Sequence, residues 1–262
     1  EIEFLCNIAQ PDFGYITNFG KAHLEGFGGI EGVIKGKSEL YDYLRSNSKK
    51  VFVNEKDDLQ KEKSKGIDKI TLTSNIEFLS ADPFVQLQYG NTIIHSNLIG
   101  AYNATNIIAA VTIGEYFKIS NADIVSAIEN YTPTNNRSQI IEKENFQIIL
   151  DAYNANPSSM KVALENFHLL KKENKTVILG DMFELGDSSL VEHQNIVDLA
   201  ESLNFEKIII VGEHFYKTKA SKSLKYKDFE AFKTSFRPIP NSNLLIKGSR
   251  GMALERTLDL FD

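Results

Sequence analysis

The sequence predicts an α/β protein whose C-terminal half is a doubly wound, mostly parallel sheet. In that half, four short apolar runs alternate with segments of helical spacing, which is typical of parallel strands joined by crossover helices. The runs are residues 146–150, 176–179, 207–211 and 244–246, and the helical segments begin near Pro157, Ser189 and Met252. A chain of 262 residues, 42% hydrophobic and 24% charged, is also of the right size for one or two globular domains.

The N-terminal half is expected to be mixed in type. An apolar run at 15–17 and a strand-like run at 50–53 accompany helical segments at 30–44 and 55–65. The runs 84–88 and 92–95 flank Tyr89-Gly90-Asn91, and a Gly-Asn pair between such runs predicts a tight antiparallel hairpin. Helices are expected at 103–117 and 121–131. Turn residues at 132–136 then end the pattern, so we expect one domain at 1–134 and a second at 135–262.

Charge and cysteine content exclude several classes of protein. The chain has 29 Lys and Arg against 35 Asp and Glu, a net charge of -6, which argues against binding to nucleic acid or to an anionic membrane. A single cysteine, Cys6, cannot form an internal disulfide and suits a reducing cytoplasm. No apolar run is long enough for a membrane span. We therefore expect a cytoplasmic monomer without membrane insertion, and a piece of a longer protein, since the chain opens on Glu1.

The carboxyl ends of the four predicted parallel strands form the default ligand site. Asp151 follows the first strand and suits a ribose hydroxyl, and the helix start at Asn156-Pro157 reads as an N-cap with proline in the first turn. Ser189 and Glu192 are expected to form a capping box. The last strand ends at Lys247-Gly248-Ser249-Arg250, whose two cations suit a carboxylate or phosphate, although a solvated surface pair would look the same.

Lys37 belongs to a misleading motif. Gly36-Lys37-Ser38 matches the end of a phosphate-binding loop, but position 31 is glutamate where that loop needs glycine. Helical spacing of the apolar residues instead predicts a helix with Lys37 on its apolar face. Partial burial would lower the pKa of the amine, whereas a side chain that reaches past its neighbours to solvent would keep its ordinary pKa.

Three further polar side chains are candidates. His23 lies in the loop after the strand predicted at 15–17, where it could ligate a metal, act as a base or be an ordinary polar residue. Asn103 and Asn106 share one face at a helix start, and their carboxamides match the hydrogen-bonding edge of adenine. Helix capping would account for Asn103 equally well.

Taken together, five segments of this chain resemble the Mur ligase family. They are residues 16–28, 100–106, 151–160, 179–186 and 247–252. Tyr153-Asn154-Ala155-Asn156-Pro157 and Leu179-Gly180-Asp181-Met182 with Glu184-Leu185-Gly186 are typical of the members that add D-alanyl-D-alanine to UDP-N-acetylmuramoyl-tripeptide in peptidoglycan synthesis. The resemblance implies the later part of a central ATPase domain, followed by a Rossmann-like C-terminal domain. The UDP-binding domain and the phosphate loop would precede Glu1, so this chain alone is expected to be inactive.

The resemblance also implies the chemistry and its residues. ATP activates a carboxylate as an acyl phosphate, with Mg2+ present, and the amine of D-alanyl-D-alanine attacks it. His23 matches a magnesium ligand, and Lys37 matches a lysine that sister ligases carry as a magnesium-supporting carbamate. The implied ATP contacts are Asn103, Asn106, Arg137, Asp151, Asn154 and Asn156. The implied contacts to the other substrates are Tyr153, Lys247, Ser249 and Arg250.

Three other functions are alternatives to a Mur ligase. A folylpolyglutamate synthase shares the superfamily but not the Tyr153-Asn154 motif, and a comparison of D-alanyl-D-alanine with glutamate as substrate would separate the two. A Rossmann-type oxidoreductase would need G-x-G-x-x-G, which Glu31 interrupts after Gly26 and Gly28. A non-catalytic binding fragment is the third.

Overall fold

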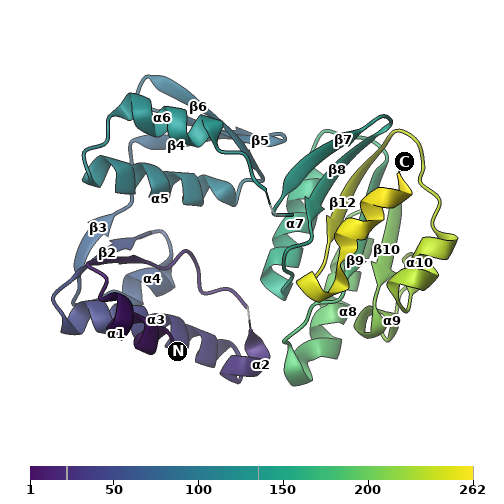
Figure 1. Cartoon of the computed structure of the whole chain (residues 1–262), viewed down its shortest axis with the longest axis horizontal. Helices are drawn as coiled ribbons and strands as arrows, with labels where there is room; N and C mark the ends of the chain where they lie inside the picture. Colours follow the sequence, from purple (N-terminus) through teal and green to yellow (C-terminus); the bar gives the residue numbers. More distant parts are fainter. Residues whose placement is uncertain (22, 135, 262) are drawn as a thin grey trace. The chain divides into compact units, whose positions relative to one another are not determined.

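The computed structural model describes residues 1–21, 23–134 and 136–261, which form two compact units. The first unit contains Glu1–Asn97 and Ala101–Tyr131, and the second contains Leu98–Gly100 and the chain from Thr132 onward (Figure 1). Asn135, where the second predicted domain begins, lies outside the described residues. No helix in the described ranges is long and apolar enough to cross a membrane.

One sheet of the first unit is parallel, with the order β1 (Phe13–Tyr15), β2 (Lys50–Val53) and β3 (Asp68–Thr71). The prediction placed the first strand at 15–17, two residues too late. Gly14 can pair there because its missing side chain makes room for Leu40 and Leu44 of α3, and a Cβ atom at this position would lie 2.7 Å from a Leu44 methyl group.

Helix α3 (Ile30–Ser46) covers this sheet, as its apolar stripe predicted. Its Tyr41 and Leu44 are buried with residues of the sheet and its loops. Helices α1 (Ile2–Ala9) and α2 (Leu24–Phe27) pack on α3. Helix α4 (Asp58–Lys63) is shorter than the predicted 55–65, because Asp57 caps it by accepting from the amides of Leu59 and Gln60.

The second sheet of the first unit has the order β4 (Ile76–Ala81), β5 (Phe84–Tyr89) and β6 (Thr92–Ile99). The predicted hairpin is confirmed, since β5 and β6 are neighbours joined by a two-residue turn in which Gly90 has a φ of 56°. Helix α5 (Asn103–Tyr116) packs on β5 and on α6 (Asn121–Asn130), close to the predicted ranges.

The sheet of the second unit has the strand order β11-β10-β9-β12-β8-β7. The four predicted parallel strands are confirmed as β8 (Phe146–Asp151), β9 (Lys175–Gly180), β10 (Lys207–Val211) and β12 (Ser242–Lys247). The prediction missed the edge strands β7 (Gln139–Lys143), which is antiparallel to β8, and β11 (Leu224–Tyr226), which is parallel to β10. Edge strands are short and half-exposed, so they lack a long apolar run.

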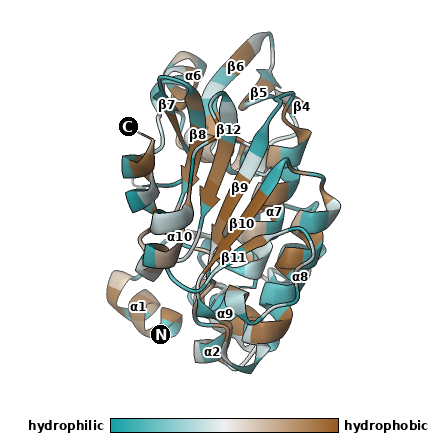
Figure 2. Cartoon of the chain, turned by 90° about the vertical axis from the view of Figure 1, so that its right-hand side faces the viewer, coloured by the Kyte–Doolittle hydropathy of each residue, from teal (hydrophilic) through white to brown (hydrophobic). Residues whose placement is uncertain are grey.

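Both faces of this sheet are covered, as a doubly wound fold requires. Helices α7 (Pro157–Leu169) and α8 (Ser189–Ser202) lie on one side of the brown, apolar strands, and α10 (Phe229–Ser235) lies on the other (Figure 2). Phe229, Phe232 and Phe236 from the α10 segment form one core with Ile148 and Ile246 of the sheet. The helix predicted from Met252 is instead two 3-10 segments, η2 (Arg250–Met252) and η3 (Leu254–Leu260), separated by Ala253 in the left-handed region. The remaining short elements are η1 (Gly186–Ser188) and α9 (Glu213–Tyr216).

Glu201, near the end of α8, holds the loop that leads into β11. Its carboxylate accepts hydrogen bonds from the amides of Ser221, Lys222 and Ser223 and from both serine hydroxyls, the shortest at 2.6 Å. Partial burial acts to raise the pKa of Glu201, but these donors outweigh it and lower the pKa to about 2.

Glu201→Gln should therefore destabilise the fold in a pH-dependent way. The depressed pKa means that the ionised carboxylate stabilises the fold above the ordinary pKa of 4.5, and that this contribution disappears as the pH falls through about 2. We expect the free energy of unfolding to drop by about 2 kcal/mol at neutral pH. Denaturant titrations at several pH values measure this, with the exposed Glu144→Gln as a control that changes little. Equal stability of wild type and Glu201→Gln at neutral pH would contradict the assignment.

Candidate functional site

A buried ion pair closes two neighbouring strand ends in the second unit. Lys247 ends β12 and Asp151 ends β8, and the parallel register places them opposite each other. The Lys247 Nζ lies 2.6 Å from the Asp151 Oδ2, and the lysine is 2% exposed. Asp151 Oδ1 also accepts from the amide of Ser138 at 3.2 Å, and Lys247 donates to the carbonyl of Asn154 at 3.2 Å. The ammonium of Lys247 is thus bonded to Asp151 and Asn154 within the protein and is not exposed to solvent.

Tyr153 follows Asp151 by two residues, and two arginine side chains lie over its ring. The guanidinium carbon of Arg137 lies 3.9 Å from the ring centre and that of Arg250 lies 5.7 Å from it. The carbonyl of Asn136 accepts from the Tyr153 amide, which places Arg137 beside the ring. Neither guanidinium has a carboxylate partner in the described part of the chain, and both arginines are exposed. Two unpaired guanidinium groups held together in this way suit a carboxylate or a phosphate.

Ser249 connects three loops rather than facing solvent. It is 3% exposed, its hydroxyl accepts from the amide of Phe183 at 2.9 Å, and its amide donates to the carbonyl of Asp181 at 3.1 Å. The same hydroxyl lies 3.4 Å from the carbonyl of Ala155. Ser249 therefore fixes the position of Arg250, the next residue, and its hydroxyl already has partners within the protein.

Asn154 and Asn156 differ in availability. Asn156 is the N-cap of α7, as predicted, and its Oδ1 accepts from the amide of Ser159 at 2.9 Å, while the Ser159 hydroxyl accepts from the Asn156 amide. Asn154 is exposed and its Oδ1 accepts from the amide of Ala155 at 2.8 Å. The side-chain oxygens of both asparagines thus already accept hydrogen bonds, and the side chain of Asn154 is the more exposed of the two.

Asp181 and His193 form a buried polar centre, and neither residue is among the predicted ligand contacts, although Asp181 follows a strand of the predicted default site. Both oxygens of Asp181 accept backbone amides at the start of α9, from His214 at 2.9 Å and from Phe215 at 2.8 Å. Gly212 permits this approach, since its φ is 130° and a Cβ atom there would lie 2.3 Å from the Asp181 carboxyl carbon. One signal for Asp181 was available, because it follows β9 as Asp151 ends β8.

The capping box predicted from Ser189 and Glu192 is wrong. Ser188 is the N-cap of α8 and makes no side-chain cap hydrogen bond. The Ser189 hydroxyl lies instead 3.1 Å from Nδ1 of His214 and 3.3 Å from Nδ1 of His193. The buried histidine attracts this hydroxyl, an effect that spacing along the helix does not reveal.

In the first unit, the predicted position of Lys37 on the buried side of α3 is confirmed. The side chain is half-buried, burial lowers the pKa of its amine, and Nζ donates to the carbonyl of Asn18 at 2.9 Å. His23 is exposed and precedes α2 in the left-handed region, with a φ of 53°. No group of three His, Cys, Asp or Glu side chains in the described ranges could hold a metal ion. A protonated Lys37 repels Mg2+, which prefers oxygen ligands, so these two residues do not make a magnesium site as they stand.

Asn103 and Asn106 are brought together at the start of α5. The Asn106 Nδ2 donates to the Asn103 Oδ1 at 2.9 Å, with Asn103 buried and Asn106 exposed. The N-cap is Tyr102, so the capping role considered for Asn103 is wrong. The exposed member of the pair, Asn106, is the one that a ligand can reach.

Gln60 is a buried polar residue that the sequence analysis missed. It is 0% exposed, and its Oε1 accepts from the amide of Asn54 at 3.1 Å. Its Nε2 donates to the Asp57 carboxylate at 3.1 Å and to the carbonyl of Thr17 at 3.4 Å. Gln60 therefore joins the loops that leave β1 and β2. No local pattern distinguishes it from an ordinary surface glutamine.

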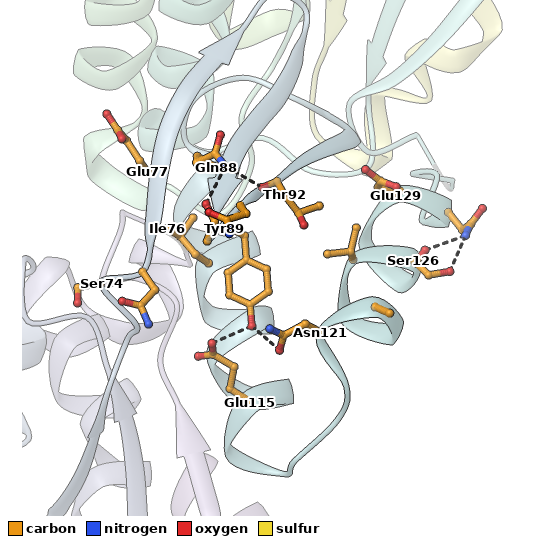
Figure 3. A pocket seen from close by; sticks show the side chains of 16 residues that line it. Ser74, Ile76, Glu77, Gln88, Tyr89, Thr92, Glu115, Asn121, Ser126 and Glu129 are labelled. Atoms are coloured by element: carbon orange, nitrogen blue, oxygen red, sulfur yellow. Dashed lines mark hydrogen bonds between the residues drawn. The ribbon is translucent and has the colours of Figure 1, made fainter.

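A hollow of about 1110 Å³ in the first unit contains none of the predicted site residues. It lies beside β5 and α6, and the Tyr89 hydroxyl points between Glu115 and Asn121, at 2.8 and 2.9 Å (Figure 3). Burial, followed by the hydrogen bond and charge of Glu115, raises the pKa of Tyr89 to about 12. These polar groups bond to one another, so the candidate site remains at the strand ends.

Two domain models match the chain. The Mur ligase middle domain matches residues 1–114, and the Mur ligase glutamate ligase domain matches residues 136–250. The UDP-N-acetylmuramoyl-tripeptide--D-alanyl-D-alanine ligase of Bacillus subtilis (strain 168) is 28% identical over 277 residues, 97% of this chain and 60% of that protein. The Escherichia coli (strain K12) protein of the same name is 25% identical over 279 residues, 98% of this chain and 62% of that protein.

Solved structures show the same similarity. MurF from Acinetobacter baumannii matches with a TM-score of 0.84 and 29% identity, covering 100% of this chain and 62% of that one. MurF ligase from Thermotoga maritima, solved with ADP, matches with a TM-score of 0.81 and 21% identity, covering 99% of this chain and 64% of that one. The chain thus spans about 60% of the length of the curated relatives it matches.

Lys247→Met should destabilise the second unit strongly, because it leaves the Asp151 carboxylate without its cation. We expect a loss of about 3 kcal/mol in the free energy of unfolding, measured by chemical denaturation. Lys161→Met is the matched control, since Lys161 is 62% exposed and lies 3.8 Å from Glu165, an arrangement worth less than about 1 kcal/mol. The double variant Asp151→Asn/Lys247→Met should lose less than the sum of the two single variants. Additive losses would show that the pair is not coupled.

Proposed function

Because this chain belongs to the Mur ligase family, we propose that it is the middle and C-terminal part of an ATP-dependent ligase that joins D-alanyl-D-alanine to UDP-N-acetylmuramoyl-tripeptide. The curated relatives named for this reaction support the substrate pair, and they align with nearly all of this chain. The enzyme would act in the cytoplasm, where both ATP and the UDP-linked precursor are available. Residues 1–134 would serve the nucleotide, and residues 135–262 would complete its binding and receive the amine.

The observation that carries this proposal is the pair of unpaired arginines on Tyr153. Each partner in such a reaction carries at least one anionic group: the phosphates of ATP, the carboxylate of the tripeptide and the carboxylate of the dipeptide. Arg137 would contact the ATP phosphates, and Arg250 with Tyr153 would orient the dipeptide carboxylate, because a planar guanidinium binds both groups with paired hydrogen bonds. Lys247 and Ser249 would position these groups, a role that their hydrogen bonds within the protein support.

The proposed nucleotide contacts are chosen in the same way: exposed polar groups would contact the nucleotide, and groups already hydrogen-bonded within the protein would position them. Asn106, held by Asn103, would read the adenine edge with its carboxamide. Asp151 and Asn154 would lie beside the ribose, and the start of α7 behind Asn156 offers backbone amides to an anion. The Thermotoga maritima protein of this fold was solved with ADP, which agrees with ATP as the energy source.

We further infer that Lys37 acts as a carbamate in the complete enzyme. Its lowered pKa leaves more of the amine neutral, and a neutral amine can attack CO2 to form an N–C bond and lose one proton to solvent, which gives a carbamate anion. That anion and His23 would then supply two ligands for Mg2+, with the others outside the described residues. Magnesium would neutralise the transferring phosphoryl group.

A folylpolyglutamate synthase is the second candidate from the same fold. The Mycobacterium tuberculosis enzyme matches with a TM-score of 0.65 and 16% identity, a likeness of fold alone. The complete enzyme should release phosphate from ATP with the UDP-linked tripeptide and D-alanyl-D-alanine, and not when glutamate replaces the dipeptide. The reverse preference would overturn the proposed function.

Arg137→Lys should show whether the positive charge of Arg137 or its planar guanidinium group matters at this site. The variant keeps the charge but loses the planar group that stacks on Tyr153, so we expect the KM for ATP to rise about tenfold, equivalent to about 1.4 kcal/mol. The steady-state kinetics of the complete enzyme measure this, with Lys161→Met as a surface control. An unchanged KM would remove Arg137 from the nucleotide site.

Lys37→Ala should lower turnover of the complete enzyme by about two to three powers of ten, the size of loss seen when charge stabilisation of a transition state is removed. Short carboxylic acids added to the assay should restore part of the activity by replacing the carbamate. Thermal melting of wild type and variant provides the control for folding. Near wild-type turnover, or a loss that follows unfolding, would return Lys37 to the role of a structural lysine that holds Asn18.

A further inference from the structure

His193 is fully buried in α8, and its hydrogen bonds determine its protonation state. Nδ1 lies 2.7 Å from the carbonyl of Ser189, and Nε2 lies 3.0 Å from the amide nitrogen of Met182. A carbonyl can only accept and an amide N–H can only donate, so the proton of the ring is on Nδ1 and Nε2 carries a lone pair. His193 is therefore a neutral imidazole in this arrangement.

The groups around the ring decide what a second proton would do. Asp181 Oδ1 lies 3.7 Å from Nε2, the ring of His214 stacks at 5.2 Å, and the edge of Phe215 faces it at 4.6 Å. Burial is the main effect and lowers the pKa of His193, reinforced by His214 and opposed by the Ser189 carbonyl, Asp181 and Glu192. A proton on Nε2 would face the Met182 N–H, break that hydrogen bond and favour Asp181 as the new partner.

These contacts look like a Ser-His-Asp catalytic triad but cannot act as one. In a hydrolase, the histidine nitrogen that faces the serine must accept its proton. Here the nitrogen nearest to the Ser189 hydroxyl is Nδ1, which already carries a proton and donates it to the Ser189 carbonyl. The other nitrogen is occupied by Met182, so the cluster has no free base.

A short chain of contacts links His193 to the arginines. Met182 lies between Asp181 and Phe183 in the loop after β9. The Phe183 amide donates to the Ser249 hydroxyl, and the Ser249 amide donates to the Asp181 carbonyl. Arg250 follows Ser249 and faces Tyr153. The loop after β9 is thus bonded on one side to His193 and on the other to the segment that presents Arg250.

We propose that His193 is a positioning residue whose neutral form, by accepting from the Met182 amide, fixes the loop 181–183 and through it Ser249 and Arg250. Protonation of His193 moves its Nε2 hydrogen bond from Met182 to Asp181 and loosens this loop. Because burial lowers the pKa of His193, the ring is neutral and the loop is held at neutral pH, and the loop is released only at a pH below the ordinary histidine value of 6.5. The nature of the ligand at Arg250 rests on the proposed function, but the link from His193 to Arg250 does not.

Nuclear magnetic resonance of this chain tests the proposal. Imidazole nitrogen shifts should show the proton on Nδ1 of His193 at neutral pH. On acidification, the amide signals of Met182, Phe183, Ser249 and Arg250 should move together with the His193 ring, with a midpoint below 6.5. In His193→Gln, a neutral side chain that does not titrate in this range, this shared movement should disappear. The matched control is His168→Gln, an exposed histidine in α7, which should leave it unchanged.

The outcomes are distinct from those of the ligase assay. A proton on Nε2 at neutral pH, or loop amides that do not follow the His193 ring, would overturn the positioning role even in an active ligase. The imidazole nitrogen shifts and the amide titration are both measured on the wild-type chain. They therefore test the positioning role of His193 even if His193→Gln does not fold. Co-titration in this chain, together with a complete enzyme that shows no ligase activity, would support the link while rejecting the proposed function.

Discussion

The site depends on burying the ammonium of Lys247 at the end of a central strand. A buried cation without a partner costs several kcal/mol, and the register of β12 on β8 supplies the partner by placing Asp151 opposite Lys247. Lys247 also donates to the Asn154 carbonyl, which fixes the segment between β8 and α7. The path of this segment places Tyr153 at the surface, where the guanidinium groups of Arg137 and Arg250 lie over its ring. The placement of the two exposed arginines therefore depends on a cation that is itself buried.

Polar residues at these strand ends fall into two groups that residue type alone does not distinguish. Asp181, His193, Ser249 and Lys247 are buried, and their hydrogen bonds are made within the protein. Arg137, Arg250 and Asn154 are exposed. Every exposed member of the second group is a donor, as an anionic ligand requires. The first group supplies rigidity, since each of its members hydrogen-bonds to a segment distant from it in sequence.

Sequence patterns predicted the parts of the molecule in which one local signal dominates. The four central strands of the second unit were found because both faces of each are buried, which produces a continuous apolar run. Lys37 was placed correctly because helical periodicity alone determines its face. The edge strands, the offset of β1 and the 3-10 segments after β12 were missed because contacts distant in sequence determine them. The same limit applies to Lys247 and Ser249, since only the neighbouring strand and loop show that their polar groups are already bonded.

Stacking on Tyr153 solves a problem that exposed arginines otherwise pose. A free arginine side chain samples many rotamers, and ordering it on binding costs conformational entropy. The guanidinium carbon of Arg137 lies 3.9 Å from the ring centre, and a contact through the ring uses none of the N–H donors of the arginine. A carboxylate partner would also order the side chain, but it would occupy those donors and cancel the charge. The aromatic ring orders the arginine without doing either, so an anion meets a cation that is both oriented and unpaired.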